Sequence, residues 1–184
     1  MPLIELIRQR RSVRSYDGRT VEREKIELCL EAARLAPSAS NSQPWKFIVV
    51  DDPSLKDRMA QAAFKGVYSL SNFAAAAPVI VAAVADKAGF ASRAGSLVRN
   101  TSFYRLDMGI AGEHFILEAA DLGLGTCWIG WFDERSVKSV LGIPRNRRVE
   151  YLISLGYPVG EMKSGGHKRV PLTEMSSFNS WRGF

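Results

Sequence analysis

Three arginines and a serine near the start of the chain could together bind an anion. They are Arg10, Arg11, Ser12 and Arg14. A guanidinium group meets two phosphate oxygens at once, a serine hydroxyl adds a donor, and three positive charges offset a dianion. The alternative is a solvated basic helix end, and the run taken alone favours that interpretation by about two to one, because charge runs usually face water.

A polar loop is the second candidate for binding. It runs from Pro37 to Trp45, with a further proline at position 44. The prolines restrict its shape, while Ser38, Asn41 and Gln43 offer hydroxyl and amide groups to a ligand. An ordinary turn is the alternative.

A glycine-rich segment over 123–130 is the third candidate. Its glycines permit close approach of the backbone to a neighbour, and the aromatic Trp128 lies among them. Cys127 in the same segment is interpreted as a small buried apolar residue rather than a nucleophile, because no histidine lies near it in sequence.

Hydrophobic periodicity and capping residues predict the elements that must position these candidates. Expected helices cover 2–10, from a cap at Thr20 to before Pro37, 54–64, 106–122, and from a cap at Asp133 to about 141; expected strands cover 45–50, 79–85, 126–130 and 149–156. The stretch before the second strand, from Gly66, is expected to be the end of a helix. The pattern predicts an α+β fold.

Composition excludes several classes of protein. The chain has 184 residues, 46% of them apolar and 24% charged, which predicts one globular domain over 1–184. Two cysteines and two histidines are too few for a disulfide framework, a zinc cluster or most hydrolytic sites. Dinucleotide-binding GxGxxG and P-loop motifs are absent. The net charge of +6 suits an anionic ligand, and without a signal peptide a cytoplasmic location is expected.

Four segments, taken in order, resemble the nitroreductase family of FMN-dependent oxidoreductases, and the resemblance covers most of the chain. The segments are Arg10–Tyr16, Ala36–Trp45, Leu122–Gly130 and Lys168–Leu172. The resemblance implies an α+β sandwich around a central mixed sheet. It also implies an intertwined homodimer with two FMN sites at its interface. A C-terminal arm over about 161–184 would reach the partner through Phe178, Trp181 and Phe184.

The resemblance further implies which residues contact FMN. The expected cofactor-binding residues are Arg10, Arg11, Ser12, Arg14, Pro37, Ser38, Ala39, Asn41, Gln43, Trp128, Ile129, Gly130, Lys168 and Arg169, with His167 as an alternative to Lys168. The arginine segment would hold the phosphate and ribityl chain, the loop would approach from the other subunit, and a backbone N–H at Ile129 or Gly130 would face flavin N5. No metal and no catalytic side chain is expected, because the reactive atom belongs to the flavin.

The activity implied by the resemblance is oxidation of NAD(P)H and reduction of nitroaromatic, quinone or similar electron-poor acceptors by a ping-pong mechanism. Two other classes stay open: a family member with different flavin chemistry, such as dehalogenation, heterocycle oxidation or flavin breakdown, and a non-enzymatic module that binds nucleic acid or a partner. His114 is interpreted as a core histidine. The segment 86–104 would cap the substrate slot, with Phe90, Phe103 and Tyr104 as candidate contacts.

Overall fold

A computed structural model describes residues 1–86, 101–160 and 168–181. The α-helices are α1 (Leu3–Gln9), α2 (Arg23–Arg34), α3 (Pro53–Ala63), α5 (Phe103–Asp121), α6 (Glu134–Leu141) and α7 (Leu172–Met175), with two 3-10 helices, η1 (Ala39–Asn41) and η2 (Gly66–Ala76). The strands are β1 (Trp45–Val50), β2 (Val79–Ala85), β3 (Gly125–Ile129) and β4 (Arg148–Gly156).

The four strands form one sheet in the order β1-β2-β4-β3, and each neighbouring pair is antiparallel. The register places Val81 opposite Val49 on one side and Ile153 on the other. The expected mixed sheet is therefore antiparallel within the described strands. The parallel pairing in the described chain is an isolated bridge between Ser12 and Thr126, at the β3 edge.

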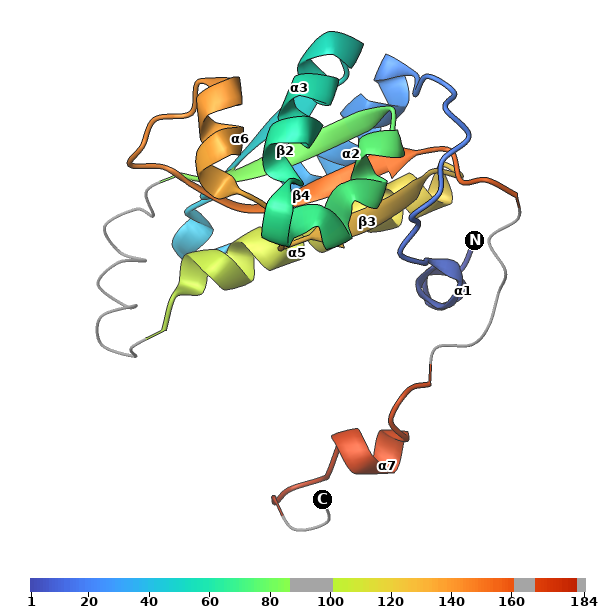
Figure 1. Ribbon diagram of the computed structural model, residues 1–184. Coiled ribbons are helices and arrows are strands. Elements are labelled where there is room, and N and C mark those ends of the chain that lie inside the picture. Colours follow the sequence, from blue (N-terminus) through green and yellow to red (C-terminus); the bar gives the residue numbers. More distant parts are fainter. Residues whose placement is uncertain (87–100, 161–167, 182–184) are drawn as a thin grey trace.

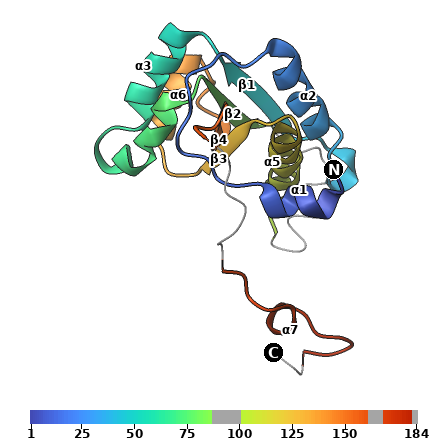
Figure 2. The ribbon, with the colours of Figure 1, turned by 90° about the vertical axis from the view of Figure 1, so that its right-hand side faces the viewer.

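Helices cover both faces of the sheet, which Figure 2 shows nearly edge-on. Alternate residues of β2 point to opposite sides, as the period of two requires, and every residue of this strand is buried. Val79, Val81 and Ala83 pack with α2 and α5, whereas Ile80 and Ala82 pack with α3 and α6. The two apolar layers confirm the predicted α+β sandwich.

The predicted strands over 45–50 and 79–85 have the bounds found in the structure, and Asp133 caps α6 by accepting a hydrogen bond from the Ser136 amide. The prediction that Thr20 caps the second helix is wrong. The N-cap is Glu22, which makes no capping bond with its side chain, and the helix begins at Arg23. The stretch from Gly66 is a separate 3-10 helix, η2, rather than the end of an α-helix.

The C-terminal arm contains a short helix, α7, which the sequence did not predict. Figure 1 shows α7 apart from the layers of the sandwich. The side chains of Phe178 and Trp181 are 90% and 84% exposed within the single chain. Residues 161–167 and Phe184, which belong to the predicted arm, lie outside the described residues.

Candidate functional site

The N-terminal arginine segment lies against the edge strand β3. The Val13 amide donates to the Thr126 carbonyl at 2.8 Å, beside the parallel bridge between Ser12 and Thr126. This close approach needs a glycine in the facing strand: a Cβ placed on Gly125 would lie 2.6 Å from Val13 Cγ2. The backbone therefore brings two of the predicted segments, 10–16 and 122–130, side by side.

The arginines of this segment have guanidinium groups without carboxylate partners in the described parts of the chain. Arg11 donates to the backbone carbonyls of Arg8 and Arg10, and Arg14 is exposed, with its guanidinium 5.5 Å from the centre of the Phe73 ring. Guanidinium groups without carboxylate partners, together with a serine hydroxyl in the same segment, are a donor set suited to a phosphate monoester.

Cys127 on β3 faces the same segment. Burial raises the pKa of its thiol, and this outweighs the opposing influence of Arg14, a hydrogen bond with Ser12 and the charge of Arg10. The thiol is therefore neutral at neutral pH, as the interpretation of Cys127 as a small buried residue requires. The influences of Arg10, Ser12 and Arg14 on this thiol agree with the placement of the arginine segment against β3.

The polar loop over 37–44 has a sharply folded backbone. Three of its residues have positive φ: Ser40 at 54°, Asn41 at 51° and Gln43 at 44°. Ser38 Oγ accepts from the Gln43 amide at 3.0 Å, and the Gln43 side chain donates to Asn41 Oδ1 at 3.0 Å. Asn41 and Gln43 are exposed. The loop thus presents polar groups outward in a defined shape.

In the described part of the single chain, no hydrogen bond or ion pair joins this loop to the arginine segment or to the end of β3. Its contacts are with α5 and, through the Pro44 carbonyl, with the Asp86 amide. Within one subunit the arginine segment and β3 therefore form one group of sequence-predicted binding residues and the loop forms another, while Lys168 and Arg169 lie on the C-terminal arm.

The end of β3 contains the predicted residues Trp128, Ile129 and Gly130. The Trp128 ring packs on Tyr151, with 4.3 Å between ring centroids, and it fills the space beside Gly112. The Ile129 side chain is buried on the other face of the sheet. Gly130 is exposed. Both large side chains are committed to packing, so this segment can present backbone groups rather than side chains to a ligand.

Trp131 follows Gly130 in the chain and was missed by sequence reasoning. Trp131 Nε1 donates to the Val67 carbonyl at 2.8 Å, and its ring lies 5.2 Å from that of Tyr68. Ser71 Oγ donates to the Trp131 carbonyl at 2.7 Å. These contacts tie η2 to the turn that follows β3. The aromatic Trp131 beside Gly130 was the available signal in the sequence.

Asp107 on α5 was also missed. It is buried, at 4% exposure, and its carboxylate accepts from the Ala39 amide and from Ser42 Oγ. The signal was its place on the apolar stripe of the helix, since Asp107, Ala111 and Phe115 follow one another at intervals of four and are all buried.

The remaining candidates from the sequence lie on α5, on the C-terminal arm or outside the described residues. His114 Nδ1 lies 3.2 Å from the Ala32 carbonyl and links α5 to α2; the predicted hydrogen bond is present, and the residue is half-buried rather than in the core. Tyr104 bonds to Glu150, and Phe103 begins α5. Lys168 and Arg169 are exposed on the C-terminal arm. His167, Phe90 and the part of 86–104 from 87 to 100 lie outside the described residues.

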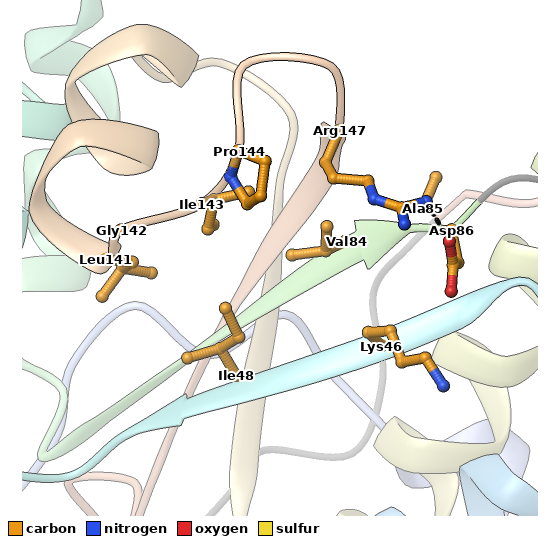
Figure 3. Close-up of a pocket in the computed structure, with 10 residues that line it drawn as sticks. All are labelled: Lys46, Ile48, Val84, Ala85, Asp86, Leu141, Gly142, Ile143, Pro144 and Arg147. Atoms are coloured by element: carbon orange, nitrogen blue, oxygen red, sulfur yellow. Dashed lines mark hydrogen bonds and ion pairs between the residues drawn. The ribbon is translucent and has the colours of Figure 1, made fainter.

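A separate cavity of about 240 Å³ lies between the ends of β1 and β2 and the connection from α6 to β4 (Figure 3). Ile48, Val84 and Ile143 line its apolar wall, and Arg147 pairs with Asp86 at one side. None of the predicted binding residues lines it.

Comparison with known proteins matches residues 7–157 to the Nitroreductase family. The chain belongs to the nitroreductase family. This membership confirms the predicted resemblance and the enzyme class, an FMN-dependent NAD(P)H oxidoreductase. No helix within the described residues is long and apolar enough to cross a membrane.

Individual relatives of this nitroreductase-family chain agree with the assignment. A protein of Archaeoglobus fulgidus that bears the provisional name NADH dehydrogenase/NAD(P)H nitroreductase is 37% identical over 162 residues, which cover 86% of each chain. The FMN-dependent nitroreductase from Clostridium difficile R20291 is 31% identical, with a TM-score of 0.77 over 97% of this chain and 99% of its own. A nitroreductase family protein from Clostridium novyi NT is 33% identical, with a TM-score of 0.73 over 88% of this chain and 90% of its own.

Proposed function

We propose that the protein binds FMN and uses NAD(P)H to reduce nitroaromatic, quinone or similar electron-poor acceptors. The observation that carries the proposal is the arginine segment beside β3. Its guanidinium groups have no carboxylate partners in the described chain, and a backbone bond and a required glycine hold the segment in place. This donor set fits the phosphate of FMN.

The residues proposed to bind FMN contact different parts of the cofactor. Arg10, Arg11, Ser12 and Arg14 would bind the phosphate and ribityl chain, together with Lys168 and Arg169 of the arm. Pro37, Ser38, Ala39, Asn41 and Gln43 would bind it from the second subunit, and the backbone of Trp128, Ile129 and Gly130 would lie along the ring system. When bound, FMN supplies hydride transfer at N5, and the protein supplies binding and orientation. NAD(P)H and the acceptor would occupy one slot in turn, which is a ping-pong scheme.

A homodimer is part of the same proposal. Large apolar side chains stand exposed on the single chain: Leu3, Ile4 and Ile7 on α1, Leu28 on α2, and Leu172, Met175, Phe178 and Trp181 on the arm. Apolar surface of this extent marks an interaction site. A second copy that covers it would also bring the loop over 37–44 to the arginine segment. The whole chain, 1–184, would then be one domain with its arm on the partner.

The cytoplasmic location stays part of the proposal. Cys29 and Cys127 are both buried free thiols, which suit a reducing compartment.

The test is the visible absorption spectrum of the purified protein after incubation with FMN and desalting, followed by anaerobic addition of NADPH and then NADH. We expect a retained flavin band that bleaches with at least one donor. Retention without bleaching would keep the cofactor and contradict NAD(P)H as donor. A folded protein that retains no flavin would contradict the assignment of FMN as cofactor and would favour the interpretation of the arginines as a solvated basic helix end.

A further inference from the structure

The buried carboxylate of Asp107 has no place in the cofactor-binding set, and the reaction does not require it as an acid or base. It lies on α5 at 4% exposure. In the described part of the chain no lysine or arginine forms an ion pair with it. A buried carboxylate without a countercharge depends on hydrogen-bond donors for its stability.

Both donors come from the polar loop. The Ala39 amide donates to Oδ1 at 3.0 Å, and the Ser42 hydroxyl donates to Oδ2 at 3.3 Å. One carboxylate oxygen thus holds the loop just before Ser40 and the other holds it just after Asn41. The two residues between these anchors are the adjacent pair with φ of 54° and 51°.

The left-handed conformation of this pair needs external support. A serine in that region is uncommon, because its Cβ crowds the carbonyl oxygen, and asparagine tolerates it better. Such conformations persist where surrounding contacts over-determine them. Within the loop, the Asn41 amide donates to the Ser38 carbonyl at 3.0 Å, and the Ser42 amide donates to the Ala39 carbonyl at 3.1 Å. From outside the loop, the Asp107 carboxylate holds the residues on either side of the pair.

We propose that Asp107 is a positioning residue that fixes the loop over 37–44 in the conformation in which it binds the cofactor. The proposal rests on the proposed function, since it takes the loop to be part of the FMN site. Asp107 acts through Ser38, Ala39 and Asn41 rather than by touching FMN itself. Because α5 also packs against the sheet and α2, Asp107 fixes the position of the loop relative to the core of its own subunit.

A carboxylate suits this task better than an amide of the same shape. Its two oxygens both accept, and both partners of Asp107 are donors. In Asp107→Asn one of the two positions becomes an NH₂ donor, so the side chain loses one acceptor and its charge. Hydrogen bonds to charged groups are the stronger kind, so the loop should open more often.

The first measurement is amide hydrogen exchange of the flavin-free protein, so that it does not depend on cofactor binding. In Asp107→Asn we expect the Ala39 amide and its neighbours in the loop to exchange about tenfold faster than in the unchanged protein. Asp121→Asn is the matched control, because Asp121 is an exposed carboxylate at the end of the same helix. It should leave exchange in the loop unchanged.

The second measurement is the FMN dissociation constant, obtained by fluorescence titration. We expect it to rise about tenfold in Asp107→Asn and to stay constant in Asp121→Asn. Ser42→Ala removes one of the two anchors and leaves the carboxylate in place. It should shift both measurements in the same direction by a smaller factor, and it serves if Asp107→Asn does not fold.

A rescue separates positioning from a general loss of stability. Glycine adopts positive φ without steric cost, so Ser40→Gly lowers the dependence of the loop on its anchors. Added to Asp107→Asn, it should recover about threefold of the lost FMN affinity. A role confined to the packing of α5 would not respond to a change at residue 40.

Three results would overturn the proposal. Unchanged loop exchange in Asp107→Asn would show that the carboxylate does not hold the loop. Faster exchange with an unchanged FMN dissociation constant would show that FMN binding does not depend on the conformation of the loop. Absence of rescue by Ser40→Gly would leave a packing role only. If the unchanged protein binds no FMN, the proposed function fails, while the exchange experiment still decides whether Asp107 holds the loop.

Discussion

At the scale of single residues, Arg11 and Arg14 differ in what their guanidinium groups contact. Val13 is buried against the core and Arg14 is exposed beside it. Arg11 turns its guanidinium back to the carbonyls of Arg8 and Arg10. Arg14 makes one longer hydrogen bond, to the Ser12 carbonyl at 3.5 Å, and is therefore freer than Arg11 to meet an external anion.

Arg14→Ala should weaken FMN binding by one charge-assisted contact, roughly 1.5–3 kcal/mol, and Arg11→Ala should have a smaller effect. The measurement is the FMN dissociation constant by fluorescence titration. Arg34→Ala is the control, since Arg34 pairs with Glu31 on α2. An unchanged constant in Arg14→Ala would remove this residue from the phosphate site.

Cys29 makes stability depend on alkaline pH. Burial, and to a smaller degree the charge of Glu118, raises the pKa of its thiol from 9.0 to about 12. Above pH 9 the unfolded chain loses the thiol proton and the folded chain keeps it. The contribution of Cys29 to the free energy of unfolding should therefore fall by about 1.4 kcal/mol for each pH unit as pH rises from 9 towards 12.

Cys29→Ala should remove this contribution and make the decline between pH 9 and 10 shallower. The substitution also lowers stability at pH 7 by opening a cavity, so the slope is the quantity to compare. Urea denaturation at pH 7, 9 and 10 gives it. Parallel slopes for the two proteins would contradict the burial argument.

At the scale of elements, the contact between β3 and the N-terminal segment depends on the absence of a side chain at Gly125. Gly125→Ala would place a methyl group against the branched side chain of Val13. We expect a loss of about 1–3 kcal/mol of stability together with weaker FMN binding, since the arginine segment must move.

Gly109→Ala is the matched control for this prediction. Gly109 lies within α5, and among the described residues nothing beyond the helix backbone lies within 4 Å of the position that the new methyl group would take. Alanine should stabilise the helix there by about 0.5–1 kcal/mol. Thermal unfolding and FMN titration of both variants check the pair. Equal melting temperatures would contradict the packing argument at Gly125.

Local patterning was enough to predict the elements that are buried on one or both faces. The continuous apolar run over 79–85 has the length and composition of a strand buried on both faces. Asp133 has the side chain of a helix N-cap and lies directly before α6. The start of α2 was missed because its cap, Glu22, makes no side-chain bond that distinguishes it from Thr20. Motif resemblance supplied the proposed site residues, whereas Asp107 was missed because its partners, Ala39 and Ser42, lie 68 and 65 residues away.

At the scale of the whole molecule, the arginine segment and the loop, both proposed to bind FMN, make no hydrogen bond or ion pair with each other in the described part of one chain. The proposed dimer would complete each site with the arginine segment of one copy and the loop of the other. A mixed dimer of an Arg14→Ala chain and an Asn41→Ala chain should then contain one intact site and one site with both defects.

Co-expression of the two variants with different affinity tags isolates this mixed dimer. Titration of the mixed dimer should give about half as many tight FMN sites as the unchanged protein. The homodimer of either variant should have no site of that affinity. If instead each site is built within one chain, the mixed dimer would contain two singly defective sites. No tight binding in the mixed dimer would therefore contradict the shared site.

Because the loop and the arginine segment are separate in one chain, the fraction of protein with bound flavin should depend on protein concentration. If neither copy alone holds the complete donor set, cofactor affinity falls as subunits part, and mass action links the two equilibria. Serial dilution should release flavin over the same range in which the oligomer dissociates. The colour of the solution would then serve as a gauge of assembly.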